Sequence, residues 1–294
     1  MGASIADMDT ELRAAYLRRL GLDAEPPSVD ALQRLHQRHV ERIAYETMWI
    51  HLGEAWGIDL GDAVTRIARQ GRGGYCFHLN GAFSELLRAL GYAVTRHVGG
   101  VHGSGGPAEE MMSNHLVLTV SGLPASENPS GTWYVDAGLG DALHGALPLA
   151  ASDYEQGPFH LVLDRTPGGV GDWHLTHDPA GGFAGMSWRT AEAGMDQFSQ
   201  RHRWLSTSPE SGFMRVATAQ RRDATGADIL RGLVLIRVGT GSAPAEPLTK
   251  RDDWLAALAD VFGLRFDATP PEALDHLWER SLAAHRAWDA AGRP

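Results

Sequence analysis

Residues 71–76 read Gly-Arg-Gly-Gly-Tyr-Cys and end on Cys76, the only cysteine of the 294-residue chain. Apolar residues recur at three- and four-residue steps from Leu79 to Leu90, which predicts a helix that starts near Cys76 and stops at Gly91. The first turn of a helix carries unpaired N–H groups and a positive partial charge, which favour a thiolate over a thiol. Cys76 is therefore the first candidate for a nucleophile.

The overall composition is that of a globular protein with an acidic balance. Hydrophobic residues make up 43% of the chain, charged residues make up 21%, and the formal net charge is −10. This charge argues against binding to nucleic acid or to an anionic membrane surface. One cysteine rules out a disulfide scaffold, and the sequence has neither an apolar leader nor a membrane-length apolar run. We therefore expect a cytoplasmic protein.

Hydrophobic periodicity divides the chain into three predicted domains of an α+β protein. Residues 1–92 have helical spacing, and Ser28 fits an N-cap after a pair of prolines. Residues 93–195 change to short runs with period two between turns rich in glycine and proline, which predicts a β-barrel or strongly curved sheet. Residues 196–294 mix strands with helices. The expected barrel strands are 92–101, 115–120, 132–136, 159–163 and 172–176.

The third domain is expected to hold a strand pair and two helices. Residues 213–220 and 230–238 are rich in residues typical of strands, and we interpret them as the pair. Residues 252–262 form an amphipathic pattern, and a second helical pattern follows Pro271. This mixture is typical of an α/β unit.

A cysteine nucleophile needs a base, and the base needs an orienting group. His115 opens one expected strand and Asp136 closes the next, so a hairpin in which Val120 faces Gly131 would set His115 directly opposite Asp136. In that register Asp136 can orient the His115 ring, and His115 can act as the base for Cys76. Each residue alone also has a structural interpretation, as a buried thiol, an ordinary histidine or a turn aspartate, and the residues alone leave both interpretations open.

The chain resembles the arylamine N-acetyltransferases at this point. The similarity begins at the nucleophile stretch and continues, in the order of that family, into the predicted barrel and the third domain. The segments that carry it are residues 16–21, 35–47, 72–77 with Asn80, 115–118, 133–140 and 204–213. The combination is specific, although each segment alone is not.

The resemblance implies a helical bundle, a β-barrel and an α/β lid, with a cysteine-protease-like triad of Cys76, His115 and Asp136. It also implies two-step acyl transfer from acetyl-coenzyme A, or another acyl-coenzyme A, through a cysteine thioester to an arylamine, hydrazine or related amine. No permanently bound cofactor and no metal are expected. The binding residues follow from the same likeness: Tyr45, Tyr75 and Leu139 for the amine, and Met111, Met112 and Trp204 for the acyl donor.

Two departures from the family pattern give further expectations. His78 stands where the family usually has a glutamate, and it points away from the thiol because it lies two residues along the helix from Cys76. We interpret it as a structural or pocket-wall residue. Tyr45-Glu46-Thr47 replaces the usual Phe-Glu-Asn. Glu46 and Arg72 nevertheless remain, and they predict a buried ion pair that braces the loop before Cys76.

Three alternatives remain at this stage. An amide synthase of the same fold would move or cyclise an acyl chain from an acyl carrier protein onto an amine. A transglutaminase-like or protease-like cysteine hydrolase shares the chain order Cys, His, Asp. A non-catalytic binding protein would leave Cys76 no more reactive than a free thiol. The expected partners are otherwise a small amine and acyl-coenzyme A.

Overall fold

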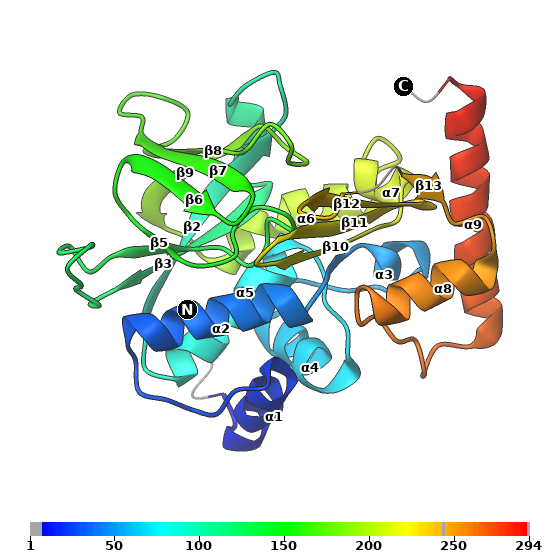
Figure 1. The fold of residues 1–294 in the computed structure, drawn as a ribbon. Coiled ribbons are helices and arrows are strands. Elements are labelled where there is room, and N and C mark those ends of the chain that lie inside the picture. Colours follow the sequence, from blue (N-terminus) through cyan, green and yellow to red (C-terminus); the bar gives the residue numbers. More distant parts are fainter. Residues whose placement is uncertain (1–7, 243–244, 293–294) are drawn as a thin grey trace.

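The computed structural model describes residues 8–242 and 245–292 (Figure 1). Helices dominate the first part of the chain and form the lower part of the molecule in Figure 1. Their buried apolar faces pack against each other and against the face of the barrel sheet that is turned away from the barrel's own core. These helices are α1 (Thr10–Leu20), α2 (Val29–Arg42), α3 (Met48–His51), α4 (Leu60–Gln70) and α5 (Cys76–Ala89).

Local sequence signals set the ends of these helices. The Ser28 hydroxyl oxygen accepts the Ala31 N–H at 3.1 Å, which confirms Ser28 as the N-cap of α2. Gly91 follows the C-cap of α5 with a φ of 93°, so the helix stops at the glycine that the sequence indicates.

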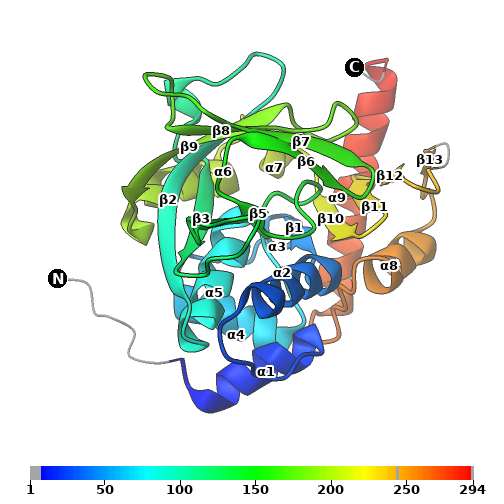
Figure 2. The ribbon, with the colours of Figure 1, turned by 60° about the vertical axis from the view of Figure 1, so that its left-hand side comes forward.

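The middle of the chain forms an eight-stranded antiparallel sheet within the described residues, with the order β5-β4-β3-β2-β9-β8-β7-β6. Figure 2 shows it curling above the N-terminal helices into a nearly closed barrel. The sheet keeps an apolar core of its own. Its strands are β2 (Ala93–His102), β3 (His115–Ser121), β4 (Trp133–Val135), β5 (Leu147–Pro148), β6 (Ser152–Gln156), β7 (Phe159–Arg165), β8 (Trp173–Thr176) and β9 (Gly185–Glu192), with a 3₁₀ turn, Glu109–Met111, between β2 and β3.

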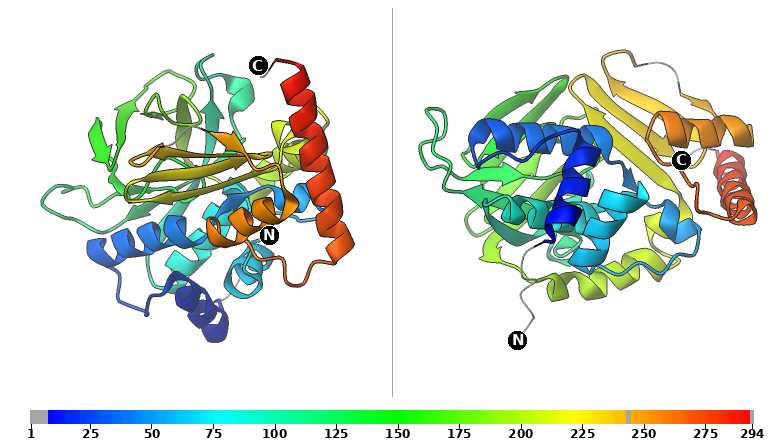
Figure 3. Two further views of the ribbon diagram at one scale, coloured as in Figure 1. Left: turned by 45° about the vertical axis from the view of Figure 1, so that its right-hand side comes forward. Right: turned by 90° about the horizontal axis from the view of Figure 1, so that it is seen from below.

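A five-stranded sheet, again counted over the described residues, has the order β1-β10-β11-β12-β13. Helices α8 and α9 pack on one of its faces, as both views of Figure 3 show, around a core that includes Leu230 and Trp254. The elements are β1 (Tyr45–Glu46), β10 (Thr218–Asp223), β11 (Gly226–Arg231), β12 (Val234–Gly239), β13 (Glu246–Pro247), the 3₁₀ turn Met195–Phe198, α6 (Ser199–Thr207), α7 (Gly212–Arg215), α8 (Arg251–Asp260) and α9 (Pro271–Ala290).

The α+β fold of helical bundle, barrel and lid is confirmed. β1 belongs to the first predicted domain, yet it pairs with β10 of the third, with Tyr45 opposite Gln220. The N-terminal helices and the lid are therefore joined by a shared sheet. The boundaries at residues 92 and 195 stay a prediction.

The predicted strand pair of the lid was wrong in detail. Residues 212–215 are helical, because the Ser211 hydroxyl accepts the Phe213 N–H at 3.2 Å and caps α7. The expected strand 230–238 is divided by a turn at Gly232, whose φ is 58°. Apolar residues stand on both sides of Arg231 and Gly232, and this pattern hides the turn from a periodicity search.

Strands β6 and β9 were not expected. β6 is an edge strand with mostly exposed side chains, and β9 is buried only over its first half, so neither has a sustained apolar alternation.

Within the described ranges, no helix has both the length and the apolar character that crossing a membrane requires.

Candidate active site

The candidate nucleophile is the first residue of α5, and its side chain is 4% exposed. Tyr75 is the N-cap residue, and no side chain of the described residues caps this helix. The His78 and Leu79 N–H groups donate to the Tyr75 carbonyl, so the N–H groups of Cys76 and Phe77 are the ones that keep their donor capacity. The positive end of the helix dipole lies at the same place. The thiol lies 3.6 Å from the Asn114 carbonyl oxygen.

The glycines before Cys76 are required by close contacts. A Cβ on Gly73 would lie 1.9 Å from the Ala44 carbonyl oxygen, and Gly74 has a φ of 131°. A Cβ on Gly74 would also strike the His78 ring. The glycine-rich approach thus lets the chain pass between β1 and α5.

His115 and Asp136 meet as expected, although the predicted register was wrong by two residues. Val120 faces Trp133 rather than Gly131, and the ladder ends before either His115 or Asp136. A shift of two residues keeps every side chain on its own face of the sheet. His115 Nε2 therefore still lies 2.8 Å from Asp136 Oδ2, with both side chains buried.

Both oxygens of Asp136 are held by neighbouring donors. Asn80 Nδ2 donates to Oδ1 at 2.7 Å, and the Gly138 N–H donates to the same oxygen at 3.0 Å. The Tyr134 hydroxyl donates to Oδ2 at 3.0 Å, beside His115. Asn80 lies one helical turn from Cys76, so the helix that carries the thiol also fixes the carboxylate.

His115 is charged at neutral pH in this arrangement. Burial lowers the pKa of His115, but the Asp136 carboxylate and Cys76 outweigh burial and raise that pKa to about 10. Because Nε2 is bonded to Asp136, the other ring nitrogen remains for Cys76.

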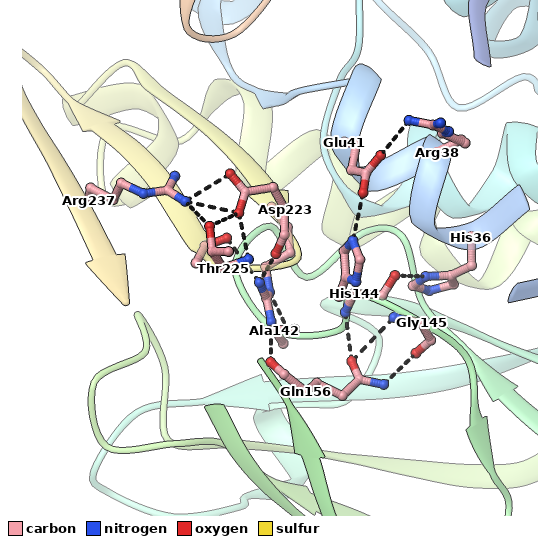
Figure 4. A network of polar contacts seen from close by, with 12 residues as sticks. His36, Arg38, Glu41, Ala142, His144, Gly145, Gln156, Asp223, Thr225 and Arg237 are labelled. Atoms are coloured by element: carbon pink, nitrogen blue, oxygen red, sulfur yellow. Dashed lines mark hydrogen bonds and ion pairs between the residues drawn. The ribbon is translucent and has the colours of Figure 1, made fainter. Parts of the chain in front are cut away.

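His36 supports this centre and was missed by sequence reasoning. Its Nε2 accepts the Asp136 N–H at 3.2 Å, and its Nδ1 donates to the His144 carbonyl at 3.0 Å. Burial lowers the pKa of His36 to about 4, so the ring is neutral near pH 7. A neutral ring has one donor and one acceptor nitrogen, as these two hydrogen bonds require. Figure 4 shows His144 between His36 and Glu41. His36 occupies an apolar helical position, and only its histidine identity could have signalled a polar role.

A cavity of about 650 Å³ opens beside Cys76 and His115. Of the predicted binding residues, Tyr45 and Leu139 line it. The lid sheet and α9 provide much of the far wall. Further lining residues are Asp141, Phe183, Phe213, Thr218, Gln220, Arg231, Ile236, His285 and Trp288.

The other predicted binding residues do not line this cavity. Tyr75 is fully buried and its hydroxyl lies 2.5 Å from His202 Nδ1, so its position does not support contact with a substrate. Met112 is buried and Met111 is exposed on the turn before β3. Trp204 is also exposed, and the Arg201 guanidinium lies over its ring at 5.5 Å. Within the described residues, no cluster of three histidine, cysteine or acidic side chains is arranged to hold a metal.

His78 has a structural role. Its Nε2 donates to the Gly57 carbonyl at 3.1 Å, and the ring packs edge-on against Trp49 and Tyr75. Burial lowers its pKa well below the ordinary value, so the ring is neutral. It does not line the cavity.

The expected pair of Arg72 and Glu46 is confirmed. Arg72 Nε lies 3.1 Å from Glu46 Oε1, and Arg72 Nη1 lies 3.1 Å from Glu54 Oε1. The second Glu46 oxygen accepts the Met48 N–H at 2.8 Å. Glu46 is fully buried and Arg72 is 7% exposed, so the pair braces the loop that leads to Cys76.

The substitution Arg72→Met should destabilise the protein strongly. It would leave the buried Glu46 carboxylate without its charged partner, at a cost of about 3–5 kcal/mol in the free energy of unfolding. Urea denaturation measures this loss. Arg69→Met is the matched control, because Arg69 pairs with Glu11 at 3.6 Å on the surface, where such pairs contribute about 1 kcal/mol at most. A loss no larger than that of the control would contradict the bracing role.

The class of the protein follows from comparison with known families. A family model described as N-acetyltransferase matches residues 28–270. The arylamine N-acetyltransferase pineal gland isozyme NAT-3 of Gallus gallus is 30% identical over 167 residues, which cover 54% of this chain and 54% of that protein. The chain thus spans about half the length of this curated relative.

Solved structures agree over nearly the full length. The arylamine N-acetyltransferase of Nocardia farcinica is 28% identical with a TM-score of 0.77, covering 92% of this chain and 94% of that one. The Mycobacterium marinum enzyme in complex with CoA shares the fold at 23% identity, with a TM-score of 0.78 and coverage of 91% and 97%. The chain belongs to the arylamine N-acetyltransferase family.

Proposed function

We propose that this protein transfers an acetyl or other acyl group from acyl-coenzyme A to an arylamine, hydrazine or related amine, through a thioester on Cys76. One observation carries the proposal: Cys76, the charged His115 and Asp136 come together beside a cavity of about 650 Å³. Asp136 is fixed there by hydrogen bonds from Asn80, Gly138, Tyr134 and His115. The related Mycobacterium marinum enzyme, whose structure contains CoA, supports the choice of donor.

In the first step the Cys76 thiolate attacks the thioester carbonyl of the donor. A new carbon–sulfur bond forms, the bond to the sulfur of coenzyme A breaks, and the departing thiolate takes a proton from the His115 imidazolium. The N–H groups of Cys76 and Phe77 are the available donors to the tetrahedral oxyanion, because no side chain of the described ranges caps the start of α5.

In the second step an amine attacks the acyl carbon of the Cys76 thioester. Neutral His115 accepts the proton of the amine, and the Cys76 thiolate leaves as the amide forms. Asp136 holds the imidazole in orientation through both steps and stabilises its charge in the resting enzyme. Tyr45 and Leu139 line the space that the amine would occupy.

Incubation with labelled acetyl-coenzyme A, followed by an aniline, tests the proposal. We expect one acetyl group on Cys76, located by mass spectrometry of the peptides, and its transfer to the amine on the second addition. Protein alkylated beforehand with iodoacetamide is the control and should take up no label, because Cys76 is the only thiol in the chain.

Each alternative predicts a different fate for the label. Release of acetate to water without amide would favour the hydrolase. Acylation by a carrier-protein thioester but not by acetyl-coenzyme A would favour the amide synthase. No label on Cys76 with any thioester would overturn the proposal and leave the binding protein.

A further inference from the structure

The cavity beside Cys76 carries an isolated positive charge. Among the described residues that line it, Arg231 is the only arginine or lysine and Asp141 is the only acid. Asp141 is 1% exposed, and it accepts the Gly182 N–H at 2.6 Å and faces His177 at 3.6 Å. Arg231 is exposed, and no carboxylate of the described ranges pairs with it.

The strand pattern directs Arg231 towards the cavity. Along β11, Leu230 faces the core beneath α8 and α9, whereas Ile229 faces the barrel core. Because alternate side chains share a face, Arg231 follows Ile229. Its direct neighbours across the strands, Thr218 and Val234, also line the cavity.

Two other arginines of the lid sheet already have polar partners. Arg237, on β12, lies 2.9 Å from Asp223 and 3.0 Å from Asp228, and Figure 4 shows it turned to Asp223. Arg222 is buried and donates to backbone carbonyls, including that of Ala142. Arg231 differs because its charge is open to the cavity.

Arg231 shares the cavity with the nucleophile. Tyr45 pairs with Gln220, which pairs with Ile229, so β1 and β11 are separated by two strand spacings of about 4.8 Å each. Arg231 lies two residues beyond Ile229, roughly 7 Å further along β11, and its side chain lines the same cavity as Tyr45 and Cys76. Its charge partly offsets the effect of burial and Cys76, which together raise the pKa of Tyr45. Arg231 therefore faces the same space as the groups beside Cys76.

We propose that Arg231 is a specificity residue that binds a carboxylate on the acceptor amine, so that the preferred substrate is an aromatic amine with an anionic group across the ring. This inference rests on the proposed function of the same site. A guanidinium fits a carboxylate through two parallel hydrogen bonds. The amine end of such a substrate would lie at the Cys76 thioester, and the ring would lie in the part of the cavity that Tyr45 and Phe213 line together.

The position favours the acceptor over the donor as the source of the anion. The phosphates of coenzyme A are separated from its thioester by the whole pantetheine arm, which is much longer than one ring. A donor whose acyl group is at Cys76 therefore carries its phosphates past Arg231 towards the outside of the cavity.

The test compares 4-aminobenzoate with the neutral 4-aminobenzamide as acceptors for the wild type, Arg231→Gln and Arg231→Lys. We expect Arg231→Gln to lower kcat/KM for 4-aminobenzoate by about 10- to 100-fold, and to change that for 4-aminobenzamide by less than about 3-fold. Arg231→Lys should fall between, since it keeps the charge but loses the planar fork. Arg221→Gln, which removes the same charge from the opposite face of the sheet, is the matched control.

Each assay is run with acetyl-coenzyme A and with a phosphate-free acetyl thioester of N-acetylcysteamine. An equal loss for both acceptors would overturn the proposal in favour of a structural role. A loss confined to acetyl-coenzyme A would overturn it in favour of donor phosphates. Unchanged selectivity in Arg231→Gln would also overturn it.

A second measurement does not depend on transfer. Bound 4-aminobenzoate should protect Cys76 from iodoacetamide, and Arg231→Gln should weaken this protection by a similar factor while protection by 4-aminobenzamide stays the same. If the wild type transfers no acetyl group but shows this selective protection, the proposed function fails and the anion site stands. Equal protection of the wild type by both compounds overturns the anion site.

Discussion

Replacement of Cys76 by serine should reduce acetyl transfer by about 10⁴-fold or more. A hydroxyl is slightly smaller than the thiol, so it fits the buried site without a clash and can still donate towards the Asn114 carbonyl. What is lost is the anion, because an alcohol does not ionise beside an imidazolium as a thiol does. Initial rates with an aniline and acetyl-coenzyme A measure the effect.

The fold of the Cys76→Ser protein should be unaffected. Its thermal midpoint should lie within about 4 °C of the wild type, since a larger shift would point to a loss of stability above about 1 kcal/mol. Ser152→Ala, a change on the exposed edge strand β6, is the control, because it should alter neither the rate nor the thermal midpoint. Transfer by Cys76→Ser at more than one hundredth of the wild-type rate would contradict a covalent role for Cys76.

Replacement of Asp136 by asparagine should lower kcat/KM by about 10³- to 10⁴-fold and change its pH dependence. Asp136 is the main cause that raises the pKa of His115 to about 10 against burial. Without the carboxylate, burial still lowers the pKa of His115 and only Cys76 raises it, so this pKa should fall towards its ordinary value of about 6.5 or below. His115 would then be neutral at pH 7, and the thiolate would lose its charged partner.

The rate of Cys76 alkylation by iodoacetamide as a function of pH checks this directly. The wild type should react fast at pH 7, and Asp136→Asn should react fast only at alkaline pH, where a thiol ionises unaided. Asp153→Asn, on the exposed strand β6, is the matched control and should follow the wild-type profile. A wild-type profile in Asp136→Asn would show that the carboxylate does not set the charge of His115.

The core of the candidate site could be predicted because each residue stands at the end of an element with a strong signal. Cys76 begins a helix, and His115 and Asp136 flank strands whose apolar runs are clear. The predicted register was wrong by two residues, yet the predicted contact of His115 with Asp136 still forms, since a shift of two residues keeps both side chains on the same face. The pair of Arg72 and Glu46 was accessible for a similar reason, because two opposite charges in otherwise apolar surroundings must neutralise each other.

The remainder of the site depends on tertiary contacts that leave no local pattern. His36 lies on a helix far from Asp136 in sequence, and Arg231 stands at the end of a strand that was itself misassigned through the hidden turn at Gly232. Tyr75 adjoins the nucleophile in sequence, yet its side chain turns to His202 rather than to the cavity. Adjacency in sequence was therefore a poor guide to which side chains face the substrate.

The two-residue strand β1 limits how the molecule can admit its ligands. Tyr45 faces the cavity, whereas Glu46, its neighbour on the opposite face, is locked to Arg72, and the backbone of both is bonded to β10. A hinge motion of the lid would have to break the pairing of β1 with β10 or move the Cys76 loop together with the lid. The lid and the nucleophile loop are thus tied to each other through β1 and the ion pair beneath it.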